Sequence, residues 1–207
     1  MNILLSNDDG IHARGIRVLR NALSDLGNQH VVAPHEEQSA VGHAITIFDP
    51  IRMTRVHEGD EFIGCAIHGT PADCVKVGLG EILKDEPPSI VFSGINLGPN
   101  TGVSVLYSGT VSAATEAAIH SVPSVAFSIN TYVEPEWDTA GRIAREVAEK
   151  SLANPLPDRT LLNVNIPNLP YAALKGYAIT RMARSRWIEN FHKRTDPRKN
   201  EYFWLDG

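Results

Sequence analysis

Several features that define large classes of protein are missing from this sequence. It has only two cysteines, Cys65 and Cys74, and they form no CxxC pair, so a zinc site built on thiolates is not expected. Two thiols without a signal peptide instead suggest the reducing cytoplasm. No apolar run approaches the roughly 18 residues that a membrane-spanning helix needs. We therefore expect a cytoplasmic protein that makes no contact with a membrane.

Two common nucleotide-binding motifs are also lacking. There is no G-x-G-x-x-G after the first apolar segment, so the usual evidence for a dinucleotide is missing. There is no G-x-x-x-x-G-K-[ST] either, which excludes a P-loop NTPase. With 24 acidic and 19 basic side chains the net charge is −5, so a general binder of nucleic-acid polymers is not expected.

The composition that is present fits one folded domain with an extension. Hydrophobic residues make up 43% of the 207 residues and charged residues 21%, which is enough apolar surface for a sizeable core. Basic side chains gather near the C-terminus, where eight of them lie between Lys175 and Lys199 against two acidic ones. An anionic ligand or an acidic partner could bind there, although such a segment is more typical of a solvated arm.

The first ten residues hold the feature around which the chain is organised. The apolar run Ile3–Leu5 stops at Asn7-Asp8-Asp9-Gly10, as a strand buried on both faces of a parallel sheet does when it enters a turn. Asp8 and Asp9 would then lie together at the carboxyl end of a central strand, where open α/β sheets bind ligands. Two carboxylates so close repel unless a cation lies between them, and Mg²⁺ or Mn²⁺ is the natural occupant. The alternative is that Asp8 caps the next helix and Asp9 fills the turn.

The rest of the chain alternates helical and extended patterns. Apolar residues three and four apart predict helices at about 12–26, 71–83, 111–120 and 135–152, and short apolar segments predict strands at 31–33, 89–93, 123–129 and 160–166. Weak alternation at 44–54 and 61–68 predicts a β-hairpin excursion, and a further strand is expected at 176–182. We expect an α/β protein with a Rossmann-like three-layer fold and a mostly parallel central sheet. Residues 1–170 would form the core and 171–207 a C-terminal extension.

Three further polar segments fall at the same predicted edge of the sheet. Ser39 lies in a polar loop, Asn96 just past the strand 89–93, and Ser108-Gly109-Thr110 before the helix 111–120. The amide oxygen of Asn96 is a possible ligand for a hard cation, and the free N–H groups at the helix start favour a phosphate. Each segment also has an ordinary alternative: a turn residue, an Asx-turn or an N-cap.

Together these segments resemble the SurE survival proteins. The resemblance covers essentially the whole chain and rests on Asn7-Asp8-Asp9-Gly10, Gly69-Thr70-Pro71-Ala72-Asp73-Cys74, Ser93-Gly94-Ile95-Asn96 with Gly98 and Asn100, and Tyr107-Ser108-Gly109-Thr110-Val111. It implies a divalent-metal-dependent phosphomonoesterase that acts on nucleoside 5′- and 3′-monophosphates and, for some members, on short-chain polyphosphate. It also implies one Mg²⁺ or Mn²⁺ per subunit and a homodimer or homotetramer.

The resemblance also implies roles for individual residues. Its metal ligands correspond to Asp8, Asp9, Ser39 and Asn96, and Asp8 and Asp9 are also the catalytic candidates. Attack by a metal-bound water and an aspartyl-phosphate route both remain open, and we prefer the water route because both carboxylates are expected to be ligands. Asn100, Ser108, Gly109 and Thr110 are the candidates for substrate binding.

A signalling module is the alternative to an enzyme. Receiver domains also place paired acids after a first strand, but they need another acid after a later strand and a lysine near the end of the sheet. Here the strand 89–93 runs into Gly94 and Asn96, and the strand 123–129 ends at Asn130. Family members usually continue well beyond the equivalent of Gly207, where they assemble the oligomer, so the extension is expected to be incomplete.

Overall fold

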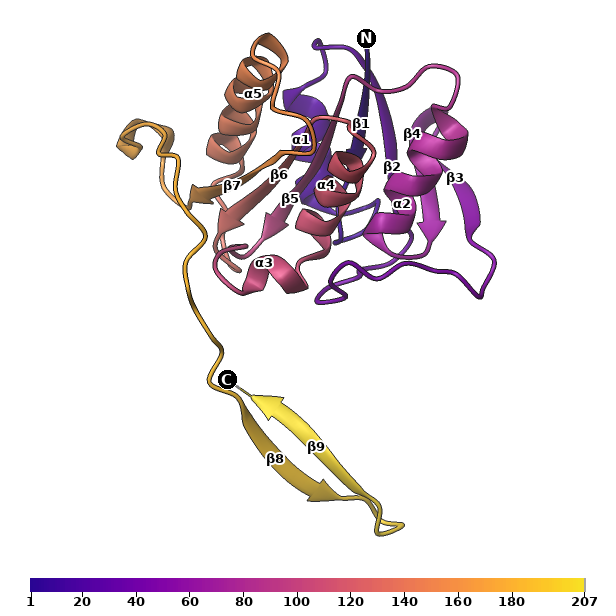
Figure 1. Ribbon diagram of the computed structural model, residues 1–207, viewed down its shortest axis with the longest axis vertical. Coiled ribbons are helices and arrows are strands. Elements are labelled where there is room, and N and C mark those ends of the chain that lie inside the picture. Colours follow the sequence, from indigo (N-terminus) through magenta and orange to yellow (C-terminus); the bar gives the residue numbers. More distant parts are fainter. Residues whose placement is uncertain (207) are drawn as a thin grey trace.

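A single mixed sheet forms the centre of the protein. The computed structural model describes residues 1–206, so Gly207, the last residue of the predicted extension, lies outside the described residues. The strands of the sheet are β1 (Asn2–Ser6), β2 (Asn28–Pro34), β3 (Arg52–Glu58), β4 (Glu61–His68), β5 (Ile90–Leu97), β6 (Ser124–Asn130) and β7 (Leu161–Pro167). Their order is β3-β4-β2-β1-β5-β6-β7, and every neighbouring pair is parallel except β3 and β4 (Figure 1). The predicted α/β class with a mostly parallel sheet is confirmed.

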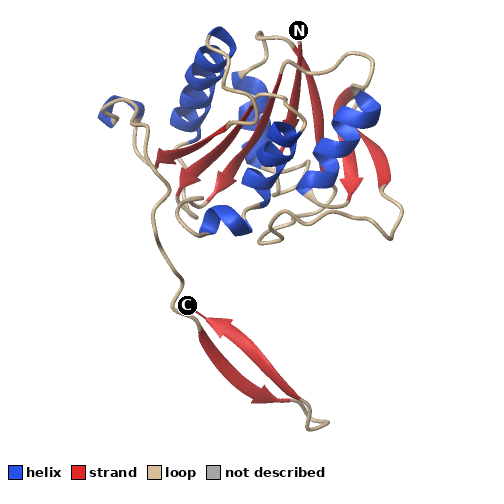
Figure 2. Ribbon diagram, in the orientation of Figure 1, coloured by secondary structure: helices blue, strands red, loops and turns tan. Residues whose placement is uncertain are grey.

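Helices cover both faces of this sheet and give the three layers (Figure 2). Helix α1 (Arg14–Ala22) packs with α5 (Trp137–Ala153) on one face, and α2 (Pro71–Val77) packs with α4 (Gly109–Ile119) on the other. Successive side chains of a strand point to opposite faces, so Ile3 and Leu5 join the core under α1 and α5, whereas Leu4 joins the core under α2 and α4. A short π-helical segment (Gly78–Ile82) continues α2. Within residues 1–206, no helix is long and apolar enough to cross a membrane.

The order of the strands reverses at β1, which is the position that organises the site. From β1 the chain builds outward through β2 and β4 on one side, and through β5, β6 and β7 on the other. β1 pairs with both inner neighbours, with Leu5 opposite Val31 and Ser6 opposite Ser93. Open α/β sheets bind ligands in the crevice outside the carboxyl ends of the strands at such a reversal. The segments that follow β1 and β5 are therefore the ones that meet there.

The predicted β-hairpin is present, but its bounds differ and it belongs to the main sheet. Its first strand, β3, begins at Arg52, so residues 44–51 are not a strand. β4 is buried from Gly64 to Ile67 and pairs in parallel with β2, which makes the hairpin the edge of the central sheet. Residues 44–51 stay a loop because hydrogen bonds tie them to α2 instead, among them the one from the Thr46 amide to Asp73 (2.9 Å).

The C-terminal extension projects away from the core (Figure 1). After a 3-10 turn (Tyr171–Ala173), an irregular segment leads to an antiparallel hairpin of β8 (Asn190–Thr195) and β9 (Glu201–Asp206), which the sequence did not predict. The predicted strand at 176–182 is wrong. This segment has no neighbouring strand to pair with, and Ile179 is 93% exposed. The hydroxyls of Tyr171 and Tyr177 anchor its start by donating to Glu146 on α5 (2.7 and 2.5 Å).

The contact between α1 and β5 allows a test of this packing. A Cβ atom added at Gly15 would lie 2.0 Å from the carbonyl oxygen of Ile95. Helix propensity alone predicts that Gly15→Ala stabilises the protein by about 1 kcal/mol, whereas overpacking predicts destabilisation by about 1–3 kcal/mol. We expect urea unfolding to show destabilisation. Gly80→Ala is the control, because a Cβ at Gly80 meets nothing within 4 Å, and a Gly15 variant at least as stable as the wild type would contradict the packing.

Candidate metal and phosphate site

The turn after β1 places two carboxylates at the strand reversal. The Asn7 amide closes this turn by donating to the carbonyl of Gly10 (2.8 Å), and Gly10 has φ +97°, which favours glycine. Asp8 is buried, with 4% of its surface exposed, and Asp9 is partly buried. The alternative role for Asp8 is wrong, because α1 is preceded by Ala13, without a side-chain cap. Asp8 instead faces a helix far away in the sequence.

That helix is α4, whose first residues lie directly against Asp8. The Thr110 hydroxyl donates to Asp8 Oδ1, and Thr110 is itself fully buried. A Cβ atom added at Gly109 would lie 2.7 Å from the Cβ of Asp8, so this close approach requires glycine. The N-terminus of a helix carries free N–H groups and a partial positive charge, which stabilise a nearby carboxylate. The start of α4, which comes after the segment that follows β5, thus packs against the turn that follows β1.

The electrostatics of the pair are unfavourable without a cation. Burial raises the pKa of Asp8, although the hydrogen bonds from Thr110 oppose this. Burial, followed by the charges of Asp8 and Glu37, raises the pKa of Asp9 to about 7. Glu37 was not identified from the sequence, because only the folded loop brings it near the pair. An acidic, partly buried site of this kind favours a bound cation, which would relieve the repulsion.

Ser39 lies in the loop formed by residues 35–51, and that loop is tied to the same turn. The backbone N–H of Gln38 donates to the carbonyl of Asp8 (2.8 Å). The Ser39 hydroxyl is exposed and donates to Glu37 Oε1 (2.6 Å), and the charge of Glu37 acts on both Asp8 and Asp9. These contacts connect the Ser39 loop to the turn of Asp8 through Gln38, and Ser39 itself to Glu37, so its role as a metal ligand stays a prediction.

Asn96 lies in β5, at the end that faces the crevice. The pairing of β5 with β6 shifts register between Ser93 and Asn96, and a cis peptide bond joins Gly94 to Ile95. The Asn96 amide donates to the carbonyls of Leu97 (3.1 Å) and Gly98 (2.8 Å). The predicted alternative, an Asx-turn, would use Oδ1 as an acceptor from the backbone, which is not the arrangement found. With its N–H groups engaged, Asn96 has Oδ1 left to bind a donor or a cation.

The candidate substrate-binding residues are all engaged in holding the loops of the site. Asn100 is buried, and its amide donates to Ser128 on β6 (2.9 Å), while its backbone accepts from Asn163 and Asn165 on β7. Ser108 caps α4 by accepting from the Val111 amide (3.1 Å), so the N-cap alternative is confirmed for Ser108. Gly109 and Thr110 thus lie against Asp8 and Ser108 caps the same helix, whereas the contacts of Asn100 are with β6 and β7; substrate binding by these four residues stays a prediction.

The donor set fits a hard divalent cation. Asp8, Asp9, Ser39 and Asn96 offer two carboxylates, a hydroxyl and an amide, and all four are oxygen ligands of the type that Mg²⁺ and Mn²⁺ prefer. The neighbouring Oδ1 of Asn7 is buried with no hydrogen-bond partner in the described chain. Residues 1–206 contain no cluster of three or more histidine, cysteine, aspartate or glutamate side chains arranged as metal ligands. A metal held here would therefore need the neutral oxygens as well as the carboxylates.

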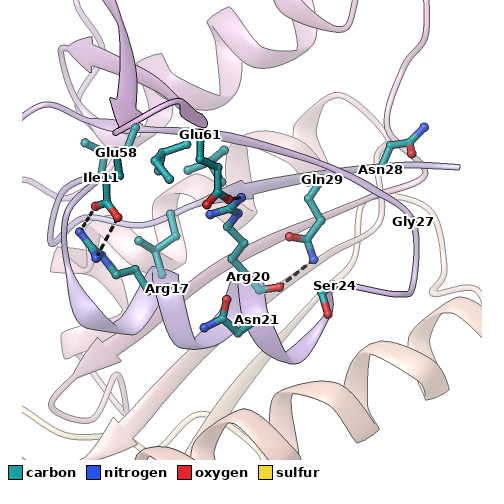
Figure 3. Close-up of a pocket in the computed structure, with 13 residues that line it drawn as sticks. Ile11, Arg17, Arg20, Asn21, Ser24, Gly27, Asn28, Gln29, Glu58 and Glu61 are labelled. Atoms are coloured by element: carbon teal, nitrogen blue, oxygen red, sulfur yellow. Dashed lines mark hydrogen bonds and ion pairs between the residues drawn. The ribbon is translucent and has the colours of Figure 1, made fainter.

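A cavity of about 680 Å³ lies elsewhere, between α1 and the β3–β4 hairpin (Figure 3). Its charged side chains are paired across it, Arg17 with Glu58 and Arg20 with Glu61 (2.5 Å). None of the predicted site residues lines it. The two arginines and two glutamates that line this cavity already bind one another. The strand reversal is therefore the stronger candidate for the site.

Known proteins resemble the chain over its whole length. Residues 3–189 match the family described as survival protein SurE. Proteins named 5′-nucleotidase SurE are 47% identical in Syntrophus aciditrophicus, over 100% of this chain and 77% of the relative, and 48% identical in Chlorobium luteolum, over 99% and 79%. The crystal structure of the SurE protein from Aquifex aeolicus superposes with a TM-score of 0.86 at 40% identity, over 100% of this chain and 82% of that one.

The raised pKa of Asp9 predicts a pH-dependent change in stability. In the unfolded chain Asp9 has its ordinary pKa of 3.8, but in the metal-free folded protein its pKa is raised to about 7. Ionised Asp9 therefore destabilises the fold increasingly as pH rises from about 4 to 7. With a chelator present, Asp9→Asn should stabilise the protein by roughly 1–3 kcal/mol at pH 8, and this gain should vanish towards pH 4. Urea unfolding at both pH values measures it.

Asp25→Asn is the control for this effect. The hydrogen bond from Arg145 lowers the pKa of Asp25, so this substitution should give no gain at pH 8. Added Mn²⁺ should then favour the wild type over Asp9→Asn, because the cation compensates the two charges. An Asp9→Asn variant whose stability matches the wild type at every pH, with the chelator present, would show that the carboxylates do not repel.

Proposed function

The chain belongs to the SurE survival protein family, and on that premise we propose that it is a metal-dependent 5′-nucleotidase. Its reaction would be the hydrolysis of a nucleoside 5′-monophosphate to a nucleoside and phosphate. The observation that carries this proposal is the adjacent pair Asp8–Asp9 at the strand reversal, with Asp8 buried against the N-terminus of α4. A site that gathers both acidic oxygens and helix N–H groups suits a phosphate ester bound together with a cation.

The proposed metal site consists of Asp8, Asp9, Ser39 and Asn96, with one Mg²⁺ or Mn²⁺ per subunit. A divalent ion bound there would supply a Lewis acid for the phosphoryl oxygens and an activated water. The protein's own part is to fix the ligands. Thr110 holds Asp8 Oδ1, and the amide of Asn96 is fixed by two carbonyls, so Oδ1 faces a constant direction. Ligands that are already held in place need not rearrange as negative charge develops on the phosphoryl oxygens.

The start of α4 is the proposed phosphate-binding element. Its N–H groups and partial positive charge would stabilise the negative charge that develops on the phosphoryl oxygens, with Ser108, Gly109 and Thr110 forming the wall. Asn100 would hold the facing loop through its bonds to β6 and β7. The hydrogen bond from Thr110 to Asp8 supports the water route over an aspartyl-phosphate, because it makes the carboxylate a poorer nucleophile.

We further propose activity on 3′-monophosphates and short-chain polyphosphate, and a homodimer or homotetramer in the cytoplasm. The β8–β9 hairpin supports an oligomer, because it carries large apolar side chains that the core does not cover; these are Phe191, Tyr202, Phe203, Trp204 and Leu205. The free, buried thiols of Cys65 and Cys74 support a reducing compartment.

The activity is tested by phosphate release from nucleoside monophosphates. We expect multiple turnover with Mn²⁺ or Mg²⁺ and none with a chelator. Asp8→Asn should lower kcat/KM by about 100-fold or more while the protein stays folded, because it removes a charge from the metal site but keeps an oxygen that can accept from Thr110. Circular dichroism checks the fold. Near-normal turnover of this variant at saturating Mn²⁺ would contradict the proposed metal site.

The substrate class is tested in the same assay. A nucleoside 5′-monophosphate and a simple alkyl phosphate are compared at equal Mn²⁺ concentration, with the 3′-monophosphate and a short polyphosphate alongside. The loop formed by residues 35–51 follows β2, and the segment 98–107, which ends in the short helix α3 (Ser104–Tyr107), follows β5, so they flank the end of β1 from both sides. They could enclose a nucleoside that a bare phosphatase would not need. Equal kcat/KM for the nucleotide and for the alkyl phosphate would reduce the proposal to a phosphatase without a nucleoside pocket.

A further inference from the structure

The loop that carries Ser39 has no strand or helix of its own to fix it. On one side of Ser39, the backbone N–H of Gln38 binds the carbonyl of Asp8. On the other side the backbone turns through Ala40 and Gly42, which both have positive φ (57° and 59°), and the Gly42 N–H donates to the carbonyl of Tyr107 (3.0 Å). Side-chain contacts must hold such a loop if Ser39 is to keep one position.

One such contact joins His43 to a buried carboxylate on α4. Glu116 is 2% exposed and lies on a helix whose other buried residues are mostly small and uncharged. Its Oε1 accepts from Lys76 (2.7 Å) and lies 3.1 Å from His120, while its Oε2 lies 2.7 Å from Nε2 of His43. One feature of the sequence points to these contacts: Glu116 stands among alanines on a helix face that is buried, and a buried carboxylate there needs a partner.

Glu116 is held ionised, so it remains an acceptor for His43. Burial alone would raise the pKa of Glu116, but hydrogen bonds from Lys76 and His43 outweigh burial and lower it. Lys76 comes from α2 and His120 from α4 itself, so these two partners keep the charge in place without touching the loop. Only His43 connects the carboxylate to the segment that contains Ser39.

Helix α4 therefore contacts two parts of the proposed metal site. Its first residues, Gly109 and Thr110, lie against Asp8, and Glu116 holds His43. Thr110 and Glu116 are separated by roughly 9 Å along the helix axis, at 1.5 Å per residue. Because a helix is stiff over this length, it sets the distance between Asp8 and the loop of Ser39.

We propose that Glu116 and His43 are positioning residues that set Ser39 against Asp8 and thereby tune the affinity of the site for a divalent cation. This inference rests on the proposed function. A merely structural role predicts instead that the contact stabilises the fold and leaves cation binding unchanged. The loop has a second attachment at the start of α2. Thr46 of the loop donates to Asp73, and the Thr70 hydroxyl donates to the carbonyl of Ala44 in the loop. Loss of His43 should therefore loosen residues 39–43, which then keep only the backbone bond from Gly42 to Tyr107 on this side, and leave the rest of the loop in place.

The test compares two histidines on the same carboxylate, with Mn²⁺ binding measured by calorimetry without substrate. His43→Ala should weaken Mn²⁺ binding by about 10-fold or more, as is typical for residues behind metal ligands. His120→Ala is the matched control and should change binding by less than about two-fold, because His120 contacts the same carboxylate from outside the loop. His43→Gln, whose Nε2 can reach the same carboxylate, should restore most of the affinity.

The outcomes separate this inference from the proposed function. Equal Mn²⁺ affinity for His43→Ala and the wild type, with Asp8→Asn impaired, would overturn the inference and leave the metal site intact. Equal losses in His43→Ala and His120→Ala would also overturn it, because the effect would then follow the carboxylate and not the loop. A wild type that does not bind Mn²⁺ at all would overturn both. If His43→Ala does not fold, His43→Asn, which displaces the donor, replaces it in the comparison with His43→Gln.

Discussion

The contact between Asp8 and the first turn of α4 is the constraint on which the site depends. A buried carboxylate is costly unless hydrogen-bond donors and positive charge surround it, and here a buried hydroxyl and a helix N-terminus do so. The approach is so close that position 109 has no room for a Cβ atom. The contact fixes β1 and α4 relative to each other, and the loop of Ser39 is attached to both, through Gln38 to the carbonyl of Asp8 and through His43 to Glu116.

The second carboxylate, that of Asp9, lies beside Asp8 and makes the arrangement unfavourable unless a cation is bound. Asp9 lies next to Asp8 and close to Glu37, and burial, followed by the charges of these two neighbours, raises its pKa. The metal-free protein thus keeps unfavourable charge at the strand reversal, as functional sites often do. In the proposed site, the loop of Ser39 and the end of β5 would supply neutral oxygens on either side of β1. α4 would then act as the common support for the metal, the phosphate and the loop.

The fold class and the position of the first strand could be predicted from the sequence because they depend on local patterns. The apolar run before Asp8 is read from neighbouring residues, and it forms β1. What the sequence could not provide depends on contacts between distant residues. Glu37 and the pair His43–Glu116 become visible only once the loop is folded, and the strand expected at 176–182 lacks a partner strand. The β8–β9 hairpin was missed because its exposed aromatic residues have no buried face to alternate with.

The central claim is that Asp8, Asp9, Ser39 and Asn96 form one cation site at the strand reversal. The most direct measurement is a crystal structure of the protein grown with Mn²⁺, with anomalous diffraction data collected at the manganese absorption edge. The account predicts a single strong anomalous peak per subunit, within bonding distance of oxygens from both aspartates, and with Ser39 and Asn96 among its neighbours. A strong peak elsewhere in the molecule, with none beside Asp8 and Asp9, would contradict it.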